Sequence, residues 1–320
     1  MARKRKGTPI HGWLAIDKPL GLSSAQVVAK VKWILQAAKV GHGGTLDPLA
    51  TGVLPIALGE ATKTVSYVMD GSKTYAFQIR WGQATATDDR EGEVVETSDI
   101  RPDRAGIEAA LGGFTGEIEQ IPPAYSAIKV GGERSYDLAR SGEAVELKSR
   151  QVHVESFTLD AMPDADHADF TVVCGKGTYI RSLARDLARA LGTVGHVAVL
   201  RRTACGPFRE QEAISLESLQ ELGQGPGPRA YLLPVETALD DIPALALTEA
   251  EARRLQSGGP VSLLHVASRF PQTRFEQGTM CRAMDGKRMV ALARIEGGEI
   301  RPVRVLNLTN DIGVDDVDHA

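Results

Sequence analysis

The sequence lacks paired cysteines, long hydrophobic runs and an excess of positive charge. Its three cysteines lie far apart and form no Cys-x-x-Cys motif, which argues against a zinc site or a disulfide framework and fits a reducing cytoplasm. No apolar run reaches the roughly 18 residues of a membrane span. The apolar run 13–16 is too short for the core of a signal peptide. We therefore expect a cytoplasmic protein without a membrane partner.

The net charge of −4 excludes a chain that is basic over its whole surface. Because attraction to phosphate depends on the local field, any contact with RNA must come from local basic patches. The run Arg3–Lys6 is one such patch, and it is equally compatible with a solvated tail. The acidic stretch 315–318 is typical of a disordered tail.

The order of helical and strand patterns predicts an α+β fold. Apolar residues recur at helical spacing from the capping serines at 23 and 24 to about Lys39, and again over 180–191. Residues 75–81 alternate between apolar and polar, as in a half-buried strand. Because helices and strands do not alternate regularly, we expect a mixed, largely antiparallel sheet with flanking helices. Further patterns predict helices over 103–111 and 135–140, strands over 152–159 and 170–174, and a returning strand at 94–95.

A second, smaller unit is expected near the C-terminus. The stretch Gly223–Pro228 is the best candidate for a linker. After about Asp241, the spacing of Thr248 and Glu251 predicts a capping box at the start of a short helix. Two apolar runs, 289–295 and 300–306, flank a Gly-Gly turn and predict a β-hairpin.

The segment Gly41–Pro55 is the most informative part of the chain. It reads GHGGTLDPLATGVLP, and Asp47 is its only acid. Glycines allow unusual backbone angles and prolines restrict their neighbours, so the composition indicates a shaped loop that displays one carboxylate. The alternative is that Asp47 caps a turn, as many Asp-Pro pairs do. A glycosidase would need a second carboxylate, and none lies in this segment, although a distant one remains possible.

This loop resembles the active-site loop of the TruB family of tRNA pseudouridine synthases. Six separated segments share the resemblance, in family order and over about Gly12 to Leu222. Together they are far more specific than any one of them. They are Asp17-Lys18-Pro19, the Asp47 loop, Lys73-Thr74-Tyr75, Ile121–Lys129, Lys176–Leu183 and Leu200-Arg201-Arg202.

The resemblance implies a pseudouridine synthase fold and a function in tRNA modification. It implies a catalytic domain over 11–240 and a small PUA-like RNA-binding domain over 241–310, with a basic tail at 1–10 and an acidic tail at 311–320. The implied reaction is isomerisation of uridine to pseudouridine at position 55, in the T-arm of tRNA. It needs no cofactor and no metal. The implied partner is tRNA alone, bound by a monomer without a guide RNA or a protein partner.

The resemblance also assigns roles to particular residues. Asp47 is the implied nucleophile, Arg181 the cation that keeps it ionised, and Tyr75 the residue that contacts the target base and assists proton removal. The alternatives are a helix surface charge for Arg181, whose Gly-Thr-Tyr-Ile-Arg context favours the functional role, and a core residue for Tyr75. The implied substrate-binding residues are His42, Tyr75, Tyr179 and Leu200, and the implied supports of the loop are Lys18, Pro19, Gly43 and Gly44. Without the resemblance, His42 would be interpreted as a structural residue and Leu200 as an ordinary residue of the hydrophobic core.

Four further arginines remain open. Arg185 and Arg189 follow Arg181 at intervals of four, so the three arginines share one helical face. We expect Arg185 and Arg189 to be solvated rather than bound to phosphate. Arg201 and Arg202 are candidate phosphate contacts or surface charges. Two rival functions also remain. One is a guide-dependent relative, the dyskerin-like subunit of a box H/ACA particle, and the other is an RNA-binding module without catalysis.

Overall fold

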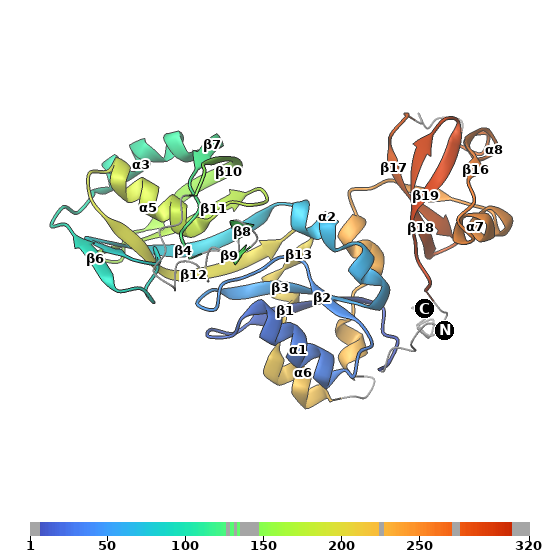
Figure 1. Cartoon of the computed structure of the whole chain (residues 1–320), viewed down its shortest axis with the longest axis horizontal. Helices are drawn as coiled ribbons and strands as arrows, with labels where there is room; N and C mark the ends of the chain where they lie inside the picture. The colour runs from blue at the N-terminus through green and yellow to red at the C-terminus, as the bar shows by residue number, and fades with distance from the viewer. Residues whose placement is uncertain are drawn as a thin grey trace, which may run out of the picture.

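The computed structural model describes residues 7–125, 129–130, 133–134, 147–223, 227–270 and 276–308. The basic run Arg3–Lys6, the helix expected over 135–140 and the acidic tail at 311–320 lie outside the described residues. The chain forms a large mixed sheet with flanking helices, followed by a smaller sheet near the C-terminus (Figure 1). The predicted α+β fold is confirmed.

The main sheet has the strand order β14-β1-β3-β12-β4-β11-β10-β7, with β2 paired to β3 and β13 to β12. The pairs β1–β14 and β3–β12 are parallel, and the other pairs are antiparallel. The strands are β1 Gly12–Lys18, β2 Val40–His42, β3 Thr51–Leu58, β4 Lys73–Trp81, β7 Gly116–Gln120, β10 Arg150–Ala161, β11 His167–Cys174, β12 Gly195–Cys205, β13 Phe208–Arg209 and β14 Ile214–Ser215.

Helices cover this sheet in two groups (Figure 1). Helices α1 (Ser24–Ile34) and α6 (Leu216–Leu222) lie together beside β1, whereas α3 (Arg104–Leu111) and α5 (Ile180–Ala190) cover the other end. Helix α1 begins with a capping box formed by Ser23 and Gln26. It ends at Ile34 instead of near Lys39, because Gln36 has a positive φ of 49° that a helix cannot continue.

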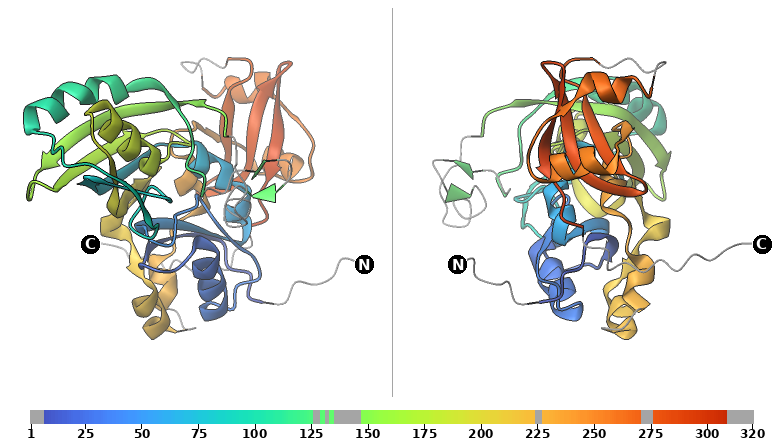
Figure 2. Two further views of the ribbon diagram at one scale, coloured as in Figure 1. Left: turned by 60° about the vertical axis from the view of Figure 1, so that its left-hand side comes forward. Right: turned by 90° about the vertical axis from the view of Figure 1, so that its right-hand side faces the viewer.

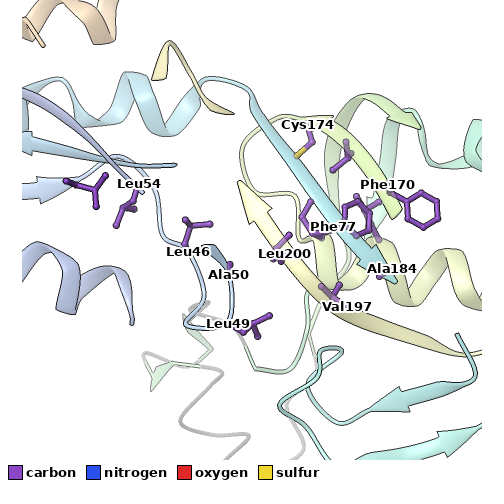
Figure 3. Close-up of a cluster of buried hydrophobic side chains, with 14 of the residues drawn as sticks. Leu46, Leu49, Ala50, Leu54, Phe77, Phe170, Cys174, Ala184, Val197 and Leu200 are labelled. Carbon is purple, nitrogen blue, oxygen red and sulfur yellow. The ribbon is translucent and has the colours of Figure 1, made fainter. Parts of the chain in front are cut away.

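The core explains why these patterns fold as they do. On β4, Phe77, Ile79 and Trp81 are buried on one face, as their alternation predicts. Phe77 and Phe170 stack with their ring centroids 5.5 Å apart. The apolar stripe of α5 packs into the same cluster. Figure 3 shows that this cluster extends to the Asp47 loop, since Leu46, Leu49 and Ala50 lie across from Leu200 on β12.

Short elements connect these parts. They are 3-10 helices η1 (Gly59–Lys63), η2 (Gly112–Phe114), η3 (Glu210–Glu212), η4 (Gly227–Tyr231) and η5 (Val235–Leu239), and helix α2 (Val65–Asp70). Strands β5 (Gln83–Thr85) and β6 (Val94–Thr97) pair with each other, as do β8 (Lys129–Val130) and β9 (Glu133–Arg134). The strand expected at 94–95 therefore exists but does not return to β4, and its two valines are exposed.

The C-terminal unit is a five-stranded sheet of order β15-β17-β18-β19-β16. The expected capping box of Thr248 and Glu251 opens α7, and the expected hairpin joins β18 to β19. Its elements are β15 (Ala244–Ala246), α7 (Glu249–Gln256), β16 (Val261–Ser262), α8 (Leu263–Ala267), β17 (Met280–Asp285), β18 (Arg288–Glu296) and β19 (Glu299–Val305).

The two units share a hydrophobic cluster. Trp13 and Phe208 of the main sheet pack in one cluster with Met289, Leu292 and Leu306 of the C-terminal unit. Figure 2 shows the C-terminal sheet standing beside the main sheet. Residues 227–239, which begin at the end of the Gly-Pro stretch, pack onto the first unit through η4 and η5, so the stretch does not separate the two units.

Candidate active site

The Asp47 loop runs between β2 and β3, and two buried cations hold it. The Nζ atom of Lys18 donates hydrogen bonds to the carbonyl oxygens of Pro19, Leu22 (2.6 Å) and Pro48 (3.2 Å). Because Pro48 directly follows Asp47, Lys18 anchors the loop from the β1 side. Burial lowers the pKa of Lys18 to about 8, although the Asp47 carboxylate opposes that shift. Lys18 thus lies where the resemblance implies a support of the loop. Pro19 takes part through its carbonyl oxygen, which accepts a hydrogen bond from Lys18.

Arg202 holds the loop from the β12 side. Its guanidinium donates to the carbonyl oxygens of Val53 (2.8 Å), Gly44 (3.1 Å) and Thr45 (3.4 Å). Its side chain is fully buried. The interpretation of Arg202 as a phosphate contact or surface charge is therefore wrong, because its side chain is buried and bonded to the backbone on both sides of Asp47.

Two glycines allow the close approach that these contacts require. Gly52 has a φ of 99°, and a Cβ atom there would lie 2.2 Å from the carbonyl oxygen of Arg202. A Cβ atom on Gly43 would lie 2.7 Å from Cγ1 of Val68. Gly43 also donates its N–H to the carbonyl oxygen of Pro55 at 2.8 Å. The sequence composition therefore reflects a loop that presses against β12 and α2.

Asp47 forms an ion pair with Arg181, from the first turn of α5. The distance between Arg181 Nη2 and Asp47 Oδ2 is 2.8 Å. The Arg181 side chain is 5% exposed, whereas that of Asp47 is 35% exposed. A carboxylate that is reachable from solvent is thus held by a buried cation. The structure brings together the two residues that the resemblance pairs.

Arg181 has further acceptors on the loop that follows β5. Its Nη1 lies 3.4 Å from Oδ2 of Asp89 and donates to the carbonyl oxygen of Thr87 at 2.9 Å. Its Nη2 also donates to the carbonyl oxygen of Tyr125 at 2.9 Å. The sequence interpretation missed Asp89, a buried second carboxylate on the same guanidinium. The concentration of acids and threonines in 82–92 was the available signal.

Tyr75 lies on β4 opposite Arg202 of β12, and the two side chains share a hydrogen bond. Burial raises the pKa of Tyr75 to about 12, although the Arg202 guanidinium opposes that rise. The phenol is therefore neutral at ordinary pH. Arg202 connects it to the loop that carries Asp47.

The remaining expected site residues surround these groups. Nδ1 of His42 accepts a hydrogen bond from the N–H of Gly44 at 3.3 Å, and burial lowers the pKa of His42, so its ring is neutral. Tyr179 caps α5, and Gln120 holds it through bonds to both its N–H (2.7 Å) and its carbonyl oxygen. Leu200 is buried across from the loop, as a core residue or the wall of a pocket would be (Figure 3).

Two other arginines are paired rather than free. Arg185 contacts Asp88 at 3.0 Å and Asp186 at 2.9 Å, and only 15% of its side chain is exposed, so the expected solvated position is wrong. Arg201 binds both oxygens of Asp17, at 3.0 and 3.1 Å, and also Glu210. Of the three arginines along α5, only Arg189 is exposed.

Neither a metal site nor a membrane-spanning helix is present among the described residues. No group of three or more His, Cys, Asp and Glu residues in the described ranges could hold a metal ion. No helix in this part of the chain is long and apolar enough to cross a membrane.

Comparisons with known proteins give one family. A model of the TruB family pseudouridylate synthase N-terminal domain matches residues 32–180, and a model of the tRNA pseudouridylate synthase B C-terminal domain matches 181–240. The tRNA pseudouridine synthase B of Rhodospirillum rubrum is 61% identical over 96% of this chain and all of the relative. The protein of that name from Caulobacter vibrioides is 53% identical over 97% of this chain and all of the relative.

Solved structures share the fold. A chain in an H/ACA RNP bound to a substrate RNA has a TM-score of 0.72 at 24% identity, covering 97% of this chain and 92% of that one. A chain in a Cbf5-Nop10-Gar1 complex has a TM-score of 0.71 at 26% identity, covering 95% and 91%.

Proposed function

This chain belongs to the TruB family of pseudouridylate synthases, and from that premise we propose that it isomerises uridine to pseudouridine at position 55, in the T-arm of tRNA. The relatives at 61% and 53% identity are both named tRNA pseudouridine synthase B, which supports tRNA as the substrate. The observation that carries the proposal is the Asp47–Arg181 ion pair, at 2.8 Å, on a loop fixed by two buried cations.

The reaction needs a nucleophile, and Asp47 suits that role. Pseudouridine forms when the N-glycosidic bond breaks, the base turns and its C5 joins the ribose. Covalent catalysis by a carboxylate divides this into easier steps. Asp47 is the more exposed partner of its ion pair and can meet a substrate, while Arg181 is held by the carbonyls of Thr87 and Tyr125. Arg181 thus stabilises the carboxylate anion without leaving its own position.

The substrate nucleotide must leave its stack before these groups can reach it. We assign Tyr75, Tyr179 and Leu200 to the pocket that receives the base. The neutral ring of His42 suits stacking within the RNA, where it would hold the nucleotide out. The phenol of Tyr75 is neutral at ordinary pH, so it would take the proton from C5 only if its own O–H proton left at the same time.

The domain assignment belongs to this proposal. Residues 11–240 form the catalytic domain, and 241–310 form a PUA-like RNA-binding domain. The enzyme acts in the cytoplasm as a monomer, without a guide RNA or partner protein. The high identity to proteins named tRNA pseudouridine synthase B supports this over a guide-dependent role, because the solved chains from H/ACA and Cbf5 complexes are only 24% and 26% identical.

The test is release of tritium from C5-labelled uridine in an unmodified tRNA transcript, using the purified chain alone. We expect release by wild type and none by Asp47→Asn, with tRNA binding retained in both. Asp164→Asn is the matched control, since Asp164 is exposed and its carboxylate contacts only His167 and the N–H of Asp166 among the described residues. Turnover by Asp47→Asn would contradict its role as nucleophile.

Two further arms separate the alternatives. A transcript with cytidine at position 55 should release no tritium, and continued release would contradict the assigned position. No release by wild type from any transcript would favour the guide-dependent relative or an RNA binder without catalysis. Addition of guide RNA and partner proteins would then distinguish those two.

A further inference from the structure

The loop between β5 and β6 contains an unusual backbone conformation at Asp88. Its φ is +59°, and Gln36 is the one other non-glycine residue with positive φ in the described ranges. Aspartate tolerates this left-handed region better than most residues, but such conformations persist only where the surroundings hold them. The residues on either side, Thr87 and Asp89, are the two that contact Nη1 of Arg181.

Arg185 holds Asp88 in this conformation. Its Nη1 lies 3.0 Å from Oδ2 of Asp88, and the two side chains are only 15% and 16% exposed. Burial raises the pKa of Asp88 above its ordinary value, while the Arg185 guanidinium opposes that rise. The backbone is fixed as well, since the N–H of Val197 on β12 donates to the carbonyl oxygen of Asp88 at 3.1 Å.

Arg185 and Arg181 bind the same two segments, one helical turn apart. Arg185 donates to the carbonyl oxygen of Ile121 at 2.9 Å, and Arg181 to that of Tyr125 at 2.9 Å. Each also binds the loop that carries Asp88. Helix α5 therefore binds both segments twice, once through Arg181 and once through Arg185. Of these two arginines, only Arg181 contacts Asp47.

The left-handed turn at Asp88 decides where the acceptors of Arg181 lie. A change of φ at Asp88 would move the Thr87 carbonyl relative to the Asp89 carboxylate. Thr87 Oγ1 also donates to Oδ1 of Asp89 at 2.5 Å, which links the two acceptors directly. The orientation of the Arg181 guanidinium, and through it that of the Asp47 carboxylate, thus depends on the Asp88 backbone.

We propose that Asp88 and Arg185 are positioning residues for the isomerisation: their ion pair fixes the loop that orients Arg181, and Arg181 in turn holds Asp47. This inference rests on the proposed function. Neither residue contacts Asp47 in the structure, and Arg185 acts through two intervening residues. A small misplacement of a reacting group lowers the reaction rate by a large factor. We therefore expect loss of the Asp88–Arg185 pair to slow the chemical step.

The test compares Arg185→Gln and Asp88→Ala with wild type in single-turnover pseudouridine formation on a tRNA transcript. Alanine lacks the carboxylate and disfavours the left-handed conformation. We expect each variant to react about 10- to 100-fold more slowly, with an unchanged dissociation constant for tRNA. The double variant should be no slower than the slower single variant, because both changes break one contact.

Conservative variants separate positioning from folding. Asp88→Asn keeps the left-handed conformation and a side-chain acceptor, so it should retain most of the rate. Arg185→Lys keeps the charge but cannot bind Asp88 and the Ile121 carbonyl at the same time, so it should retain only part of the wild-type rate. Arg189→Gln is the matched control, since Arg189 is exposed on the same helix, its side chain forms no hydrogen bond or ion pair with the described residues, and its charge acts on Asp88 less than that of Arg185 does. It should react at the wild-type rate.

Specific results would overturn the inference. These are wild-type rates in Arg185→Gln and Asp88→Ala, additive losses in the double variant, or a loss confined to tRNA affinity. A rate loss that follows a lowered melting temperature, equally in Asp88→Asn and Asp88→Ala, would show a general folding role instead. If wild type itself forms no pseudouridine, the proposed function fails, whereas active wild type with unaffected variants refutes the positioning alone.

Discussion

Single buried cations determine the shape of the Asp47 loop. Residues 43–50 of the loop lie outside the helices and strands, so most of their carbonyl groups need donors other than those of a helix or sheet. Lys18 supplies a donor to Pro48, and Arg202 supplies donors to Gly44, Thr45 and Val53. Charged donors form stronger hydrogen bonds than neutral ones, so few side chains suffice.

Replacement of Arg202 by methionine should destabilise the fold strongly. The substitution removes the Arg202 donors from the buried carbonyl groups of Val53 and Gly44, at about 1–3 kcal/mol each before relaxation, and from the less buried carbonyl group of Thr45. We expect the free energy of unfolding, measured with urea, to fall by about 3 kcal/mol or more. The neighbour Arg201 provides the control, because its side chain is 33% exposed and its ion pairs are near the surface. Equal losses in Arg201→Met and Arg202→Met would contradict the buried role of Arg202.

The lowered pKa of Lys18 predicts a pH-dependent contribution to stability. The folded pKa is about 8 and the ordinary value is 10.5, so between these values the unfolded chain binds more protons. The contribution of Lys18 to stability therefore rises with pH across this window. The free energy of unfolding of wild type minus that of Lys18→Met, measured with urea, should thus be larger near about pH 9.5 than near about pH 7.5. A constant difference would show that burial does not lower this pKa.

Among the elements, strands β3 and β12 matter most for the site. They pair in parallel through Arg201 with Thr51 and Arg202 with Gly52, where the Asp47 loop rejoins the sheet. The apolar residues Leu46, Leu49 and Ala50 also pack against the core that contains β12. The loop is thereby enclosed between a strand pair and a hydrophobic cluster, and α5 brings Arg181 to it.

Gly52→Ala should disrupt this junction. Its Cβ atom would lie 2.2 Å from the backbone oxygen of Arg202, and its φ of 99° disfavours any side chain. We expect loss of more than about 1 kcal/mol in the free energy of unfolding, and slower pseudouridine formation. Gly113→Ala is the control, because no atom lies within 4 Å of its Cβ position. A Gly52→Ala variant as stable and active as Gly113→Ala would refute this account.

In the whole molecule, the C-terminal unit is bound to the scaffold of the active loop. Trp13 and Phe208 share a cluster with Leu292 and Leu306. Polar contacts reinforce it, since Nζ of Lys63 donates to the carbonyl oxygen of Val305 at 2.8 Å. Helix η1, which contains Lys63, directly follows β3, so the second unit contacts the same strand that supports the loop.

Leu292→Ala should therefore destabilise both units together. Loss of a buried leucine costs about 2–5 kcal/mol. We expect tryptophan fluorescence, to which Trp13 of the shared cluster contributes, and circular dichroism to report one transition at lower urea than in wild type. Leu264→Ala is the control, because Leu264 is 76% exposed. Two separate transitions in wild type would show that the units unfold independently.

The sequence by itself determined the local features. The alternation on β4, the apolar stripe of α5, the capping box at Thr248 and the hairpin of β18 and β19 follow from short-range patterns, and the structure contains them. The Asp47 loop was found by composition, because glycine and proline act on the backbone where they stand. The closeness of Arg181 to Asp47 came from family resemblance, since no periodicity relates positions so far apart.

Only the tertiary structure decided which charges are buried and what they bind. Arg201 and Arg202 are adjacent and chemically identical, yet one pairs with Asp17 near the surface and the other is buried among loop carbonyls. Asp89 and Arg185 likewise gained their positions from partners on distant segments. The physical reason is that a charge can be buried only where the fold supplies opposite charges or hydrogen-bond partners, and those partners are brought together only when the sheet and α5 assemble.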